Sequence, residues 1–315
     1  MSRASDATWT GWRPLADSPP LNPAVLAEIL DGGQAFRWHP TSSNDPCWVG
    51  IFGPHAARIR LDTTGRPHWS VLARPNGTSE SEFSRYLNLG SNLARSVDSL
   101  PWRSDAHLKR CIDAFPGLTI LRQPFGETLL CFLCSATKQI VQIKQMVGLL
   151  ANRHGAALAK ELEATAGVVG TALFRLPTWA ELAAVPETDL RACLLGFRAR
   201  YIHQTAQFLA SRPGWLDETE QLPYAEAKAR LCSLPGVGEK VADCVLLFGA
   251  GRMEAFPVDV WIIKAMALRY GLEGWKPSQI AHFGRTHFGP FAGLAQQYLF
   301  AWERRFGRSS KPAGL

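Results

Sequence analysis

The chain has 315 residues, of which 46% are apolar, and carries a formal net charge of +7. This length is sufficient for two domains with substantial cores, and the positive charge favours a polyanionic partner, either nucleic acid or an acidic membrane surface. The first stretch, MSRASDATWTGW, lacks the apolar segment and cleavage site of a secretory signal, and no apolar run reaches the roughly 18 residues that a membrane span needs. We therefore expect an intracellular protein outside the membrane, in the cytoplasm or nucleoid of a prokaryote or the nucleus of a eukaryote.

Near the start, LNPAVLAEILDGGQAFRW predicts a short helix. Asn22 suits the N-cap and Pro23 the first helical position, while Gly32 and Gly33 end the helix. The segments CWVGIFG and AARIRLDTTGRPHWSVLA then alternate apolar and polar residues, with TTGR as a turn between two strands. These patterns predict a helix followed by an antiparallel sheet.

From about residue 79 onward, helical periodicity replaces the alternation. Short loops that contain glycine and proline separate the helical segments, as in a compact helical domain. The fold class that we predict is α+β. It comprises an N-terminal antiparallel-sheet domain, residues 1–115, followed by an all-helical domain, residues 116–315.

The seven cysteines show no spacing typical of a disulfide framework, which indicates a reducing compartment. Cys131 and Cys134 form a C-x-x-C within the apolar, helix-like run ETLLCFLCSATKQI. No second cysteine pair follows, and His282 and His287 are spaced unsuitably for two ligands on one helical face. We therefore expect no metal site.

The stretch YAEAKARLCSLPGVGEKVADCVLLFG predicts two helices, residues 224–233 and 239–248, joined by the tight turn LPGVG. Gly236 and Gly238 allow the chain to turn sharply and leave backbone N–H groups free at the start of the second helix, where a phosphate oxygen can bind. This helix–hairpin–helix predicts contacts with a DNA backbone. A glycine turn that binds no DNA is the alternative.

Lys240 stands in the first turn of that second helix, where the helix dipole disfavours a cation. It is either a solvated charge, a phosphate contact or a nucleophile. Cys244, four residues further, lies on the same helical face. Asp259 in FPVDVW opens a later helix and is either a plain N-cap or also a carboxylate that stabilises positive charge on a deoxyribose.

The segments LPGVGEKVADCVLLFG and AFPVDVW resemble the helix–hairpin–helix, Gly/Pro-Asp DNA glycosylases that carry a catalytic lysine, and most closely the 8-oxoguanine DNA glycosylases. The segments GGQAFRW, PGLTILRQPFGETLLCFLCS, LGFRARYI and GPFAGLAQQYLF follow in the family's order, so the resemblance extends from about residue 20 to residue 305. It implies a base-excision-repair enzyme with glycosylase and abasic-site lyase activities that flips the base out of duplex DNA. It also implies that no cofactor is required.

In this resemblance Lys240 is the nucleophile that displaces the base, and Asp259 stabilises the charge that develops on the sugar. Cys244 and Phe300 contact the two faces of the flipped base, and Gln296 binds its Watson–Crick edge. From the residues alone, core packing is the favoured interpretation of Phe300, and an exposed helical amide is the alternative for Gln296. Their spacing by four places both on one side of a helix.

Gly33 is implied to direct its carbonyl at the N7–H that 8-oxoguanine has and guanine lacks. An acceptor that faces the N7 lone pair of guanine is repelled, so a single contact can discriminate between the two bases. The alternative is that Gly33 serves only to end the helix.

The chain departs from the family where the opposite base is recognised. Eukaryotic members have asparagines and then an arginine after Cys-Ser, which fill the vacated space and recognise the opposite cytosine. Here SATKQIVQIK places Thr137 at the wedge position and Gln142 at the arginine position. Phe197 and Arg198 in GFRARY remain as a wedge and as a contact to phosphate or the opposite base, and Trp261 replaces a histidine. We expect only a shallow preference for cytosine opposite the lesion.

Two other functions remain open from the sequence. One is a glycosylase of the same fold for another damaged purine, which Lys240 argues against. The other is a helix–hairpin–helix protein that binds DNA without catalysis, which the combination of Lys240 and Asp259 argues against. We expect a monomer whose partner is duplex DNA that contains oxidised guanine.

Overall fold

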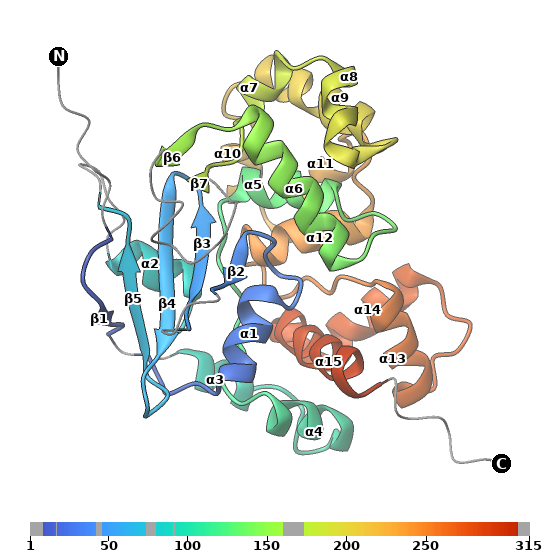
Figure 1. Ribbon diagram of the computed structural model, residues 1–315. Coiled ribbons are helices and arrows are strands. Elements are labelled where there is room, and N and C mark those ends of the chain that lie inside the picture. The colour runs from blue at the N-terminus through green and yellow to red at the C-terminus, as the bar shows by residue number, and fades with distance from the viewer. Residues whose placement is uncertain are drawn as a thin grey trace.

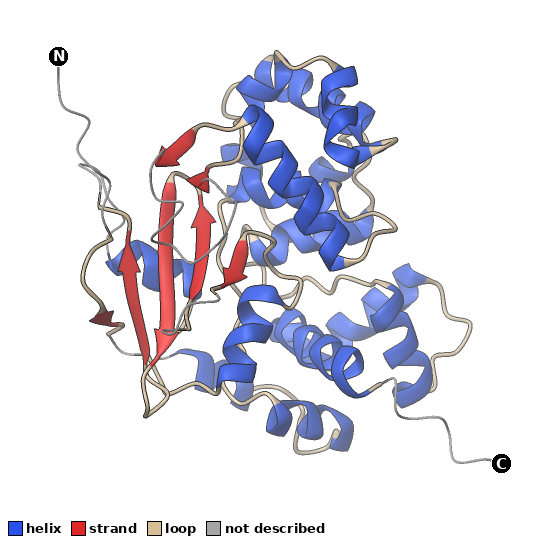
Figure 2. Cartoon of the chain, viewed as in Figure 1, coloured by secondary structure: helices blue, strands red, loops and turns tan. Residues whose placement is uncertain are grey.

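The computed structural model describes residues 9–16, 18–41, 46–73, 80–90, 92–159 and 173–307. The N-terminal part forms a five-stranded antiparallel sheet beside helices, which confirms the α+β class (Figures 1 and 2). The strands lie in the order β1-β5-β4-β3-β2 and comprise β1 (Arg13–Pro14), β2 (Trp38–Pro40), β3 (Trp48–Phe52), β4 (His55–Leu61) and β5 (Pro67–Val71).

The predicted TTGR turn joins β4 to β5. Asp62 fixes it, because one carboxylate oxygen accepts from the backbone N–H groups of Thr64 and Arg66 at 2.8 and 3.0 Å. Local turn chemistry thus sets the register in which Leu61 faces Pro67.

Helix α1 (Pro23–Asp31) begins and ends as predicted. The side chain of Asn22 accepts from the N–H of Ala24, Pro23 takes the first helical position, and Gly32 is the C-cap. Most of the remaining chain is helical and comprises α2 (Glu80–Leu87), α3 (Asn92–Asp98), α4 (Ala106–Ala114), α5 (Phe125–Leu133), α6 (Ile140–His154), α7 (Trp179–Ala183), α8 (Glu187–Leu190), α9 (Arg198–Ala210), α10 (Trp215–Gln221), α11 (Tyr224–Cys232), α12 (Glu239–Phe248), α13 (Val260–Tyr270), α14 (Pro277–Phe288) and α15 (Ala292–Phe306).

The C-terminal part is largely helical rather than all-helical, so that prediction was wrong in this detail. Strands β6 (Ala157–Ala159) and β7 (Leu173–Phe174) form a two-stranded antiparallel sheet. Leu158 and Leu173 are buried in one apolar cluster with Val49 and Ile51 of the N-terminal sheet. This burial depends on residues far apart in sequence, which periodicity within one segment cannot reveal. The boundary between residues 115 and 116 stays a prediction.

Two groups of helices make up the C-terminal part (Figure 1). One contains α5 to α12, and the other contains α13 to α15 and packs on α4. The hairpin of α11 and α12 is present as predicted, although α11 ends one residue early, at Cys232. None of the helices in the described ranges is long and apolar enough to cross a membrane.

Candidate active site

A cavity of about 980 Å³ lies between the two groups of helices. The loop between α5 and α6 lines it together with α12, the start of α13 and one face of α15. It brings together most of the residues that the sequence singled out: Gly33, Thr137, Gly236, Gly238, Lys240, Cys244, Asp259, Gln296 and Phe300.

Lys240 is directed along this cavity by contacts with the end of α5. Its Nζ donates to Ser135 Oγ at 3.1 Å and lies 5.1 Å from the centre of the Phe132 ring. The hydroxyl of Ser135 in turn donates to the carbonyl of Phe132 at 2.7 Å. Lys240 is therefore a half-buried, positioned amine and not a solvated surface charge.

Asp259 enters the same cavity from the other group of helices. It is the N-cap of α13 and accepts from the backbone N–H groups of Trp261 and Ile262 at 3.1 and 2.9 Å. Burial raises the pKa of Asp259, while the N–H of Ile262 and the positive charge of Lys240 act to lower it. The predicted N-cap is thus confirmed. The cap hydrogen bonds hold the Asp259 carboxylate near the positive charge of Lys240.

Cys244 lies one helical turn beyond Lys240 and is buried. Burial raises the pKa of this thiol to about 12, so it is neutral at physiological pH. A neutral thiol behaves as a small apolar group and can pack against a flat base.

Gly33 has a role beyond ending α1, because Gly32 already caps that helix. Its φ of +110° is one that L-residues rarely adopt. A Cβ at this position would lie 3.0 Å from Ile140 Cδ1 and 3.6 Å from Phe300 Cε1. Both the backbone angle and the close wall of the cavity therefore require glycine.

Gln34 fixes this turn to the chain before α5 and was missed as a functional residue. Its amide donates to the carbonyl of Thr119 and accepts from the N–H of Leu121, both at 2.9 Å, and its own carbonyl accepts from Gln123 Nε2 at 2.7 Å. A lone glutamine between glycines and aromatic residues in GGQAFRW was the available signal.

Gln296 and Phe300 lie on successive turns of α15, as their spacing predicts. Gln296 is buried; its Nε2 donates to the carbonyl of Pro257 at 3.1 Å and its Oε1 accepts from Gln297 Nε2 at 2.7 Å. It is therefore not an exposed amide. Phe300 is half-buried and lines the cavity.

The loop that bears Thr137 borders the cavity with a strained backbone. Thr137 has a φ of +55°, which is an outlier for a β-branched residue. Arg198 secures it: the guanidinium donates to Thr137 Oγ1 at 3.0 Å and to the carbonyl of Ala136. Arg198 is buried, so its expected contact with DNA stays a prediction that requires it to leave these partners.

Phe197 and Gln142 lie outside the cavity lining. Phe197 is 53% exposed, as a wedge requires. Gln142 is exposed, and its side-chain oxygen accepts from the N–H of Gln139 at 3.2 Å, which caps α6. It therefore caps this helix, and its contact with the opposite base stays a prediction.

The two hairpin glycines differ in the space that surrounds them. Gly236 has a φ of +77°, and a Cβ there would lie 2.6 Å from the ring of Tyr201. Gly238 is the N-cap of α12, and a Cβ there would meet no atom within 4 Å. The N-terminus of α12 is thus open to an anion beside the cavity.

Comparisons with known proteins now place this geometry in a family. The model of the 8-oxoguanine DNA glycosylase N-terminal domain matches residues 20–129, and that of the HhH-GPD superfamily base excision DNA repair protein matches residues 143–286. N-glycosylase/DNA lyase OGG1 of Arabidopsis thaliana is 32% identical over 86% of this chain and 75% of its own length. The chain belongs to the 8-oxoguanine DNA glycosylase/lyase family.

Solved structures of this family agree with the fold. The apo form of the Clostridium acetobutylicum 8-oxoguanine glycosylase/lyase is 30% identical, with a TM-score of 0.76 over 88% of this chain and 92% of that chain. The same enzyme in complex with duplex DNA containing cytosine opposite 8-oxoguanine gives a TM-score of 0.81 at 28% identity, over 95% and 99% of the two chains. The present protein is a bifunctional N-glycosylase/DNA lyase of base-excision repair, as the resemblance predicted.

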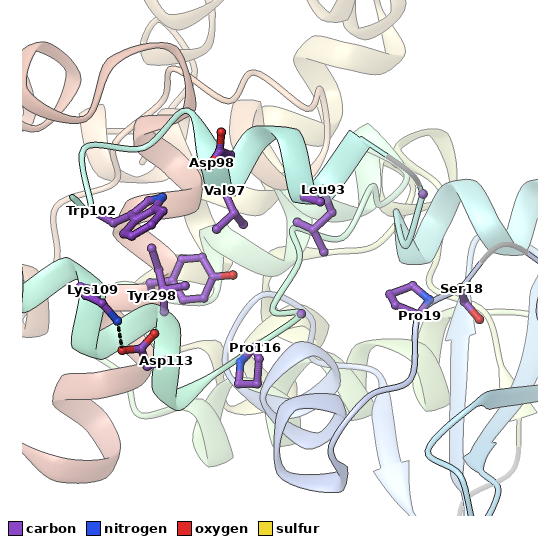
Figure 3. Close-up of a pocket in the computed structure, with 14 residues that line it drawn as sticks. Ser18, Pro19, Leu93, Val97, Asp98, Trp102, Lys109, Asp113, Pro116 and Tyr298 are labelled. Carbon is purple, nitrogen blue, oxygen red and sulfur yellow. Dashed lines mark hydrogen bonds and ion pairs between the residues drawn. The ribbon is translucent and has the colours of Figure 1, made fainter.

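A second cavity of about 770 Å³ lies on another side of α15 (Figure 3). Trp102, Leu93 and Val97 line it from α3 and the segment before α4, and Tyr298 of α15 points into it. It contains none of the residues that the family resemblance implies.

Proposed function

We propose that Lys240 is the nucleophile that removes 8-oxoguanine from duplex DNA. The lone pair of the neutral Nζ amine forms a bond to C1′ as the bond between C1′ and N9 breaks. The base leaves with that electron pair and takes up the proton that the attached nitrogen loses. The resulting amine opens the sugar to a Schiff base. Loss of the C2′ proton then breaks the C3′–O bond on the 3′ side of the lesion, which is β-elimination.

The arrangement of Lys240, Ser135 and Asp259 supports this proposal most strongly. The lysine comes from the DNA-binding hairpin, and its Nζ is held by Ser135 at 3.1 Å. The carboxylate comes from the opposite wall, where two N–H groups fix it. In this geometry Asp259 stabilises the positive charge that develops on the sugar as the base departs.

The base pocket follows from the same cavity. Cys244 and Phe300 contact the two faces of the flipped purine, Gln296 binds its Watson–Crick edge, and the Gly33 carbonyl accepts from N7–H. Gln296 Nε2 retains a second hydrogen beyond the one given to Pro257, and a base can accept it.

Duplex DNA binds along the hairpin and the loops on either side of the cavity. Gly236 and Gly238 present the α12 N-terminus to a phosphate, and Phe197 and Thr137 enter the stack on each side of the flipped nucleotide. Arg198 and Gln142 contact the opposite base or its phosphates. The clostridial relative was solved with such a lesion duplex. We infer that the enzyme acts as a monomer in the compartment that contains the cell's DNA.

Single-turnover assays on duplexes that each contain one lesion test this function. We expect excision and strand cleavage at 8-oxoguanine, and loss of both in Lys240→Gln. Lys276→Gln is the matched control, because Lys276 is exposed at the start of α14, outside the cavity lining. Full cleavage by Lys240→Gln would contradict the assignment.

A further inference from the structure

Arg304 connects two elements of the base pocket that are far apart in sequence. It lies on α15 one turn beyond Phe300 and lines the cavity. Its guanidinium carbon is 5.4 Å from the centre of the Phe300 ring. Its Nη1 donates to the carbonyl of Gly32 and to Glu28 Oε1, the latter at 2.8 Å. A single side chain therefore contacts both the end of α1 and the aromatic wall.

The turn at Gly33 needs such an external contact. Glycine has the greatest backbone freedom of any residue and no side chain with which to limit it. After Gly33, the hydrogen bonds of Gln34 fix the chain. Before Gly33, the carbonyl of Gly32 is fixed by Arg304. The Gly33 carbonyl is thus held from both sides.

Glu28 completes the arrangement. A Cβ on Gly32 would lie 2.1 Å from the backbone oxygen of Glu28 and 2.4 Å from its Oε1, so the carboxylate lies close against Gly32. The carboxylate is largely buried and is the ion-pair partner of Arg304. Glu28 thereby helps to hold the guanidinium where it contacts both the Gly32 carbonyl and the Phe300 ring.

We propose that Arg304 is a positioning residue for lesion recognition, which sets the spacing between the Gly33 carbonyl and the Phe300 ring. This proposal rests on the roles in the base pocket proposed above. The planar guanidinium can serve the carbonyl, the carboxylate and the ring at once, whereas an ammonium group is a single point charge. Arg304 itself need not touch the base.

Comparing two substrates isolates this role. Excision of 8-oxoguanine needs the base pocket, whereas cleavage at a preformed abasic site needs Lys240 but no base. In Arg304→Met, which keeps a long apolar side chain without donors, we expect single-turnover excision to slow about ten- to a hundredfold. The rate of abasic-site cleavage should change less than about threefold, because the substitution removes no contact with the sugar.

Arg304→Lys should restore part of the excision rate, because lysine retains the charge and a donor. Arg305→Met is the matched control, since Arg305 is the exposed neighbour on the same helix, and we expect it to behave as the parent. Thermal unfolding of each variant monitors the fold.

An unchanged excision rate in Arg304→Met would overturn the proposal. Equal slowing on both substrates would also overturn it, because a general structural role has that signature. Gly33→Ala is measured alongside: a parental rate there refutes the proposed base pocket, and this proposal with it. A parental rate in Arg304→Met alone refutes only the positioning role.

Discussion

Replacing Asp259 with asparagine separates its two roles. Asparagine keeps a side-chain oxygen that can accept from the N–H groups of Trp261 and Ile262, and it is as good an N-cap as aspartate. The substitution removes the negative charge alone. If that charge stabilises the transition state, excision will slow while the helix stays capped.

The magnitude follows from the site's electrostatics. Two opposite unit charges about 4 Å apart attract by about 4 kcal/mol at an effective dielectric constant of about 20. Because each 1.36 kcal/mol is about tenfold in rate, the loss corresponds to about a thousandfold at most. We expect single-turnover excision by Asp259→Asn to be about 10²- to 10³-fold slower, with DNA affinity close to the parent's.

The stability of Asp259→Asn should not fall with its excision rate. Burial raises the pKa of Asp259, so the folded state binds this proton more readily than the unfolded state. The stability that this proton contributes is complete below the pKa of Asp259 in the unfolded chain. It is lost as pH rises through the pKa of Asp259 in the folded protein. At neutral pH the buried charge thus destabilises the fold. Asp259→Asn should unfold at or above the parent's temperature, whereas Asp259→Ala loses the cap, about 1 kcal/mol.

The assay combines single-turnover rates on an 8-oxoguanine duplex with DNA binding and thermal unfolding for the parent, Asn and Ala proteins. A parental excision rate in Asp259→Asn would reduce Asp259 to a helix cap. A rate deficit matched by weaker folding would equally refute the electrostatic argument.

Three further outcomes are expected. Gly33→Ala should lower 8-oxoguanine excision at least about tenfold, because the φ of +110° and the 3.0 Å approach to Ile140 both oppose a methyl group; an unchanged rate would contradict the Gly33 contact. Because Thr137 and Gln142 stand in place of asparagine and arginine, 8-oxoguanine should be excised opposite all four bases. The preference for cytosine should be about ten- to a hundredfold smaller than an arginine contact would give. A cytosine preference of several hundredfold in single-turnover rates would show that other residues recognise cytosine. Excision should also fall as pH decreases through the raised pKa of Asp259, and the part of that fall that reports protonation of Asp259 should be absent in Asp259→Asn.

Features governed by local chemistry could be predicted from the sequence. Asn22 and Asp259 cap helices as their positions indicate, and the turn of Gly236 follows from glycine's access to positive φ. The spacing of Gln296 and Phe300 by four correctly placed both on one wall of the cavity.

Features that depend on distant segments could not be predicted. The burial of Arg198 is one of them, because its partners are the carbonyl of Ala136 and the hydroxyl of Thr137 in a loop far earlier in the sequence. The pairing of β6 with β7 depends on an apolar surface of the N-terminal sheet. Nothing within the last helix indicates that Arg304 reaches the carbonyl of Gly32, which follows α1.

The nucleophilic role of Lys240 is tested most directly by reductive trapping. With borohydride and an 8-oxoguanine duplex, the Schiff base should be reduced to a stable protein–DNA adduct, and peptide mass spectrometry should place it on Lys240. Lys240→Gln should give no adduct, and Lys276→Gln should give as much as the parent. An adduct of undiminished yield in Lys240→Gln, or one mapped to another residue of the parent protein, would contradict the account.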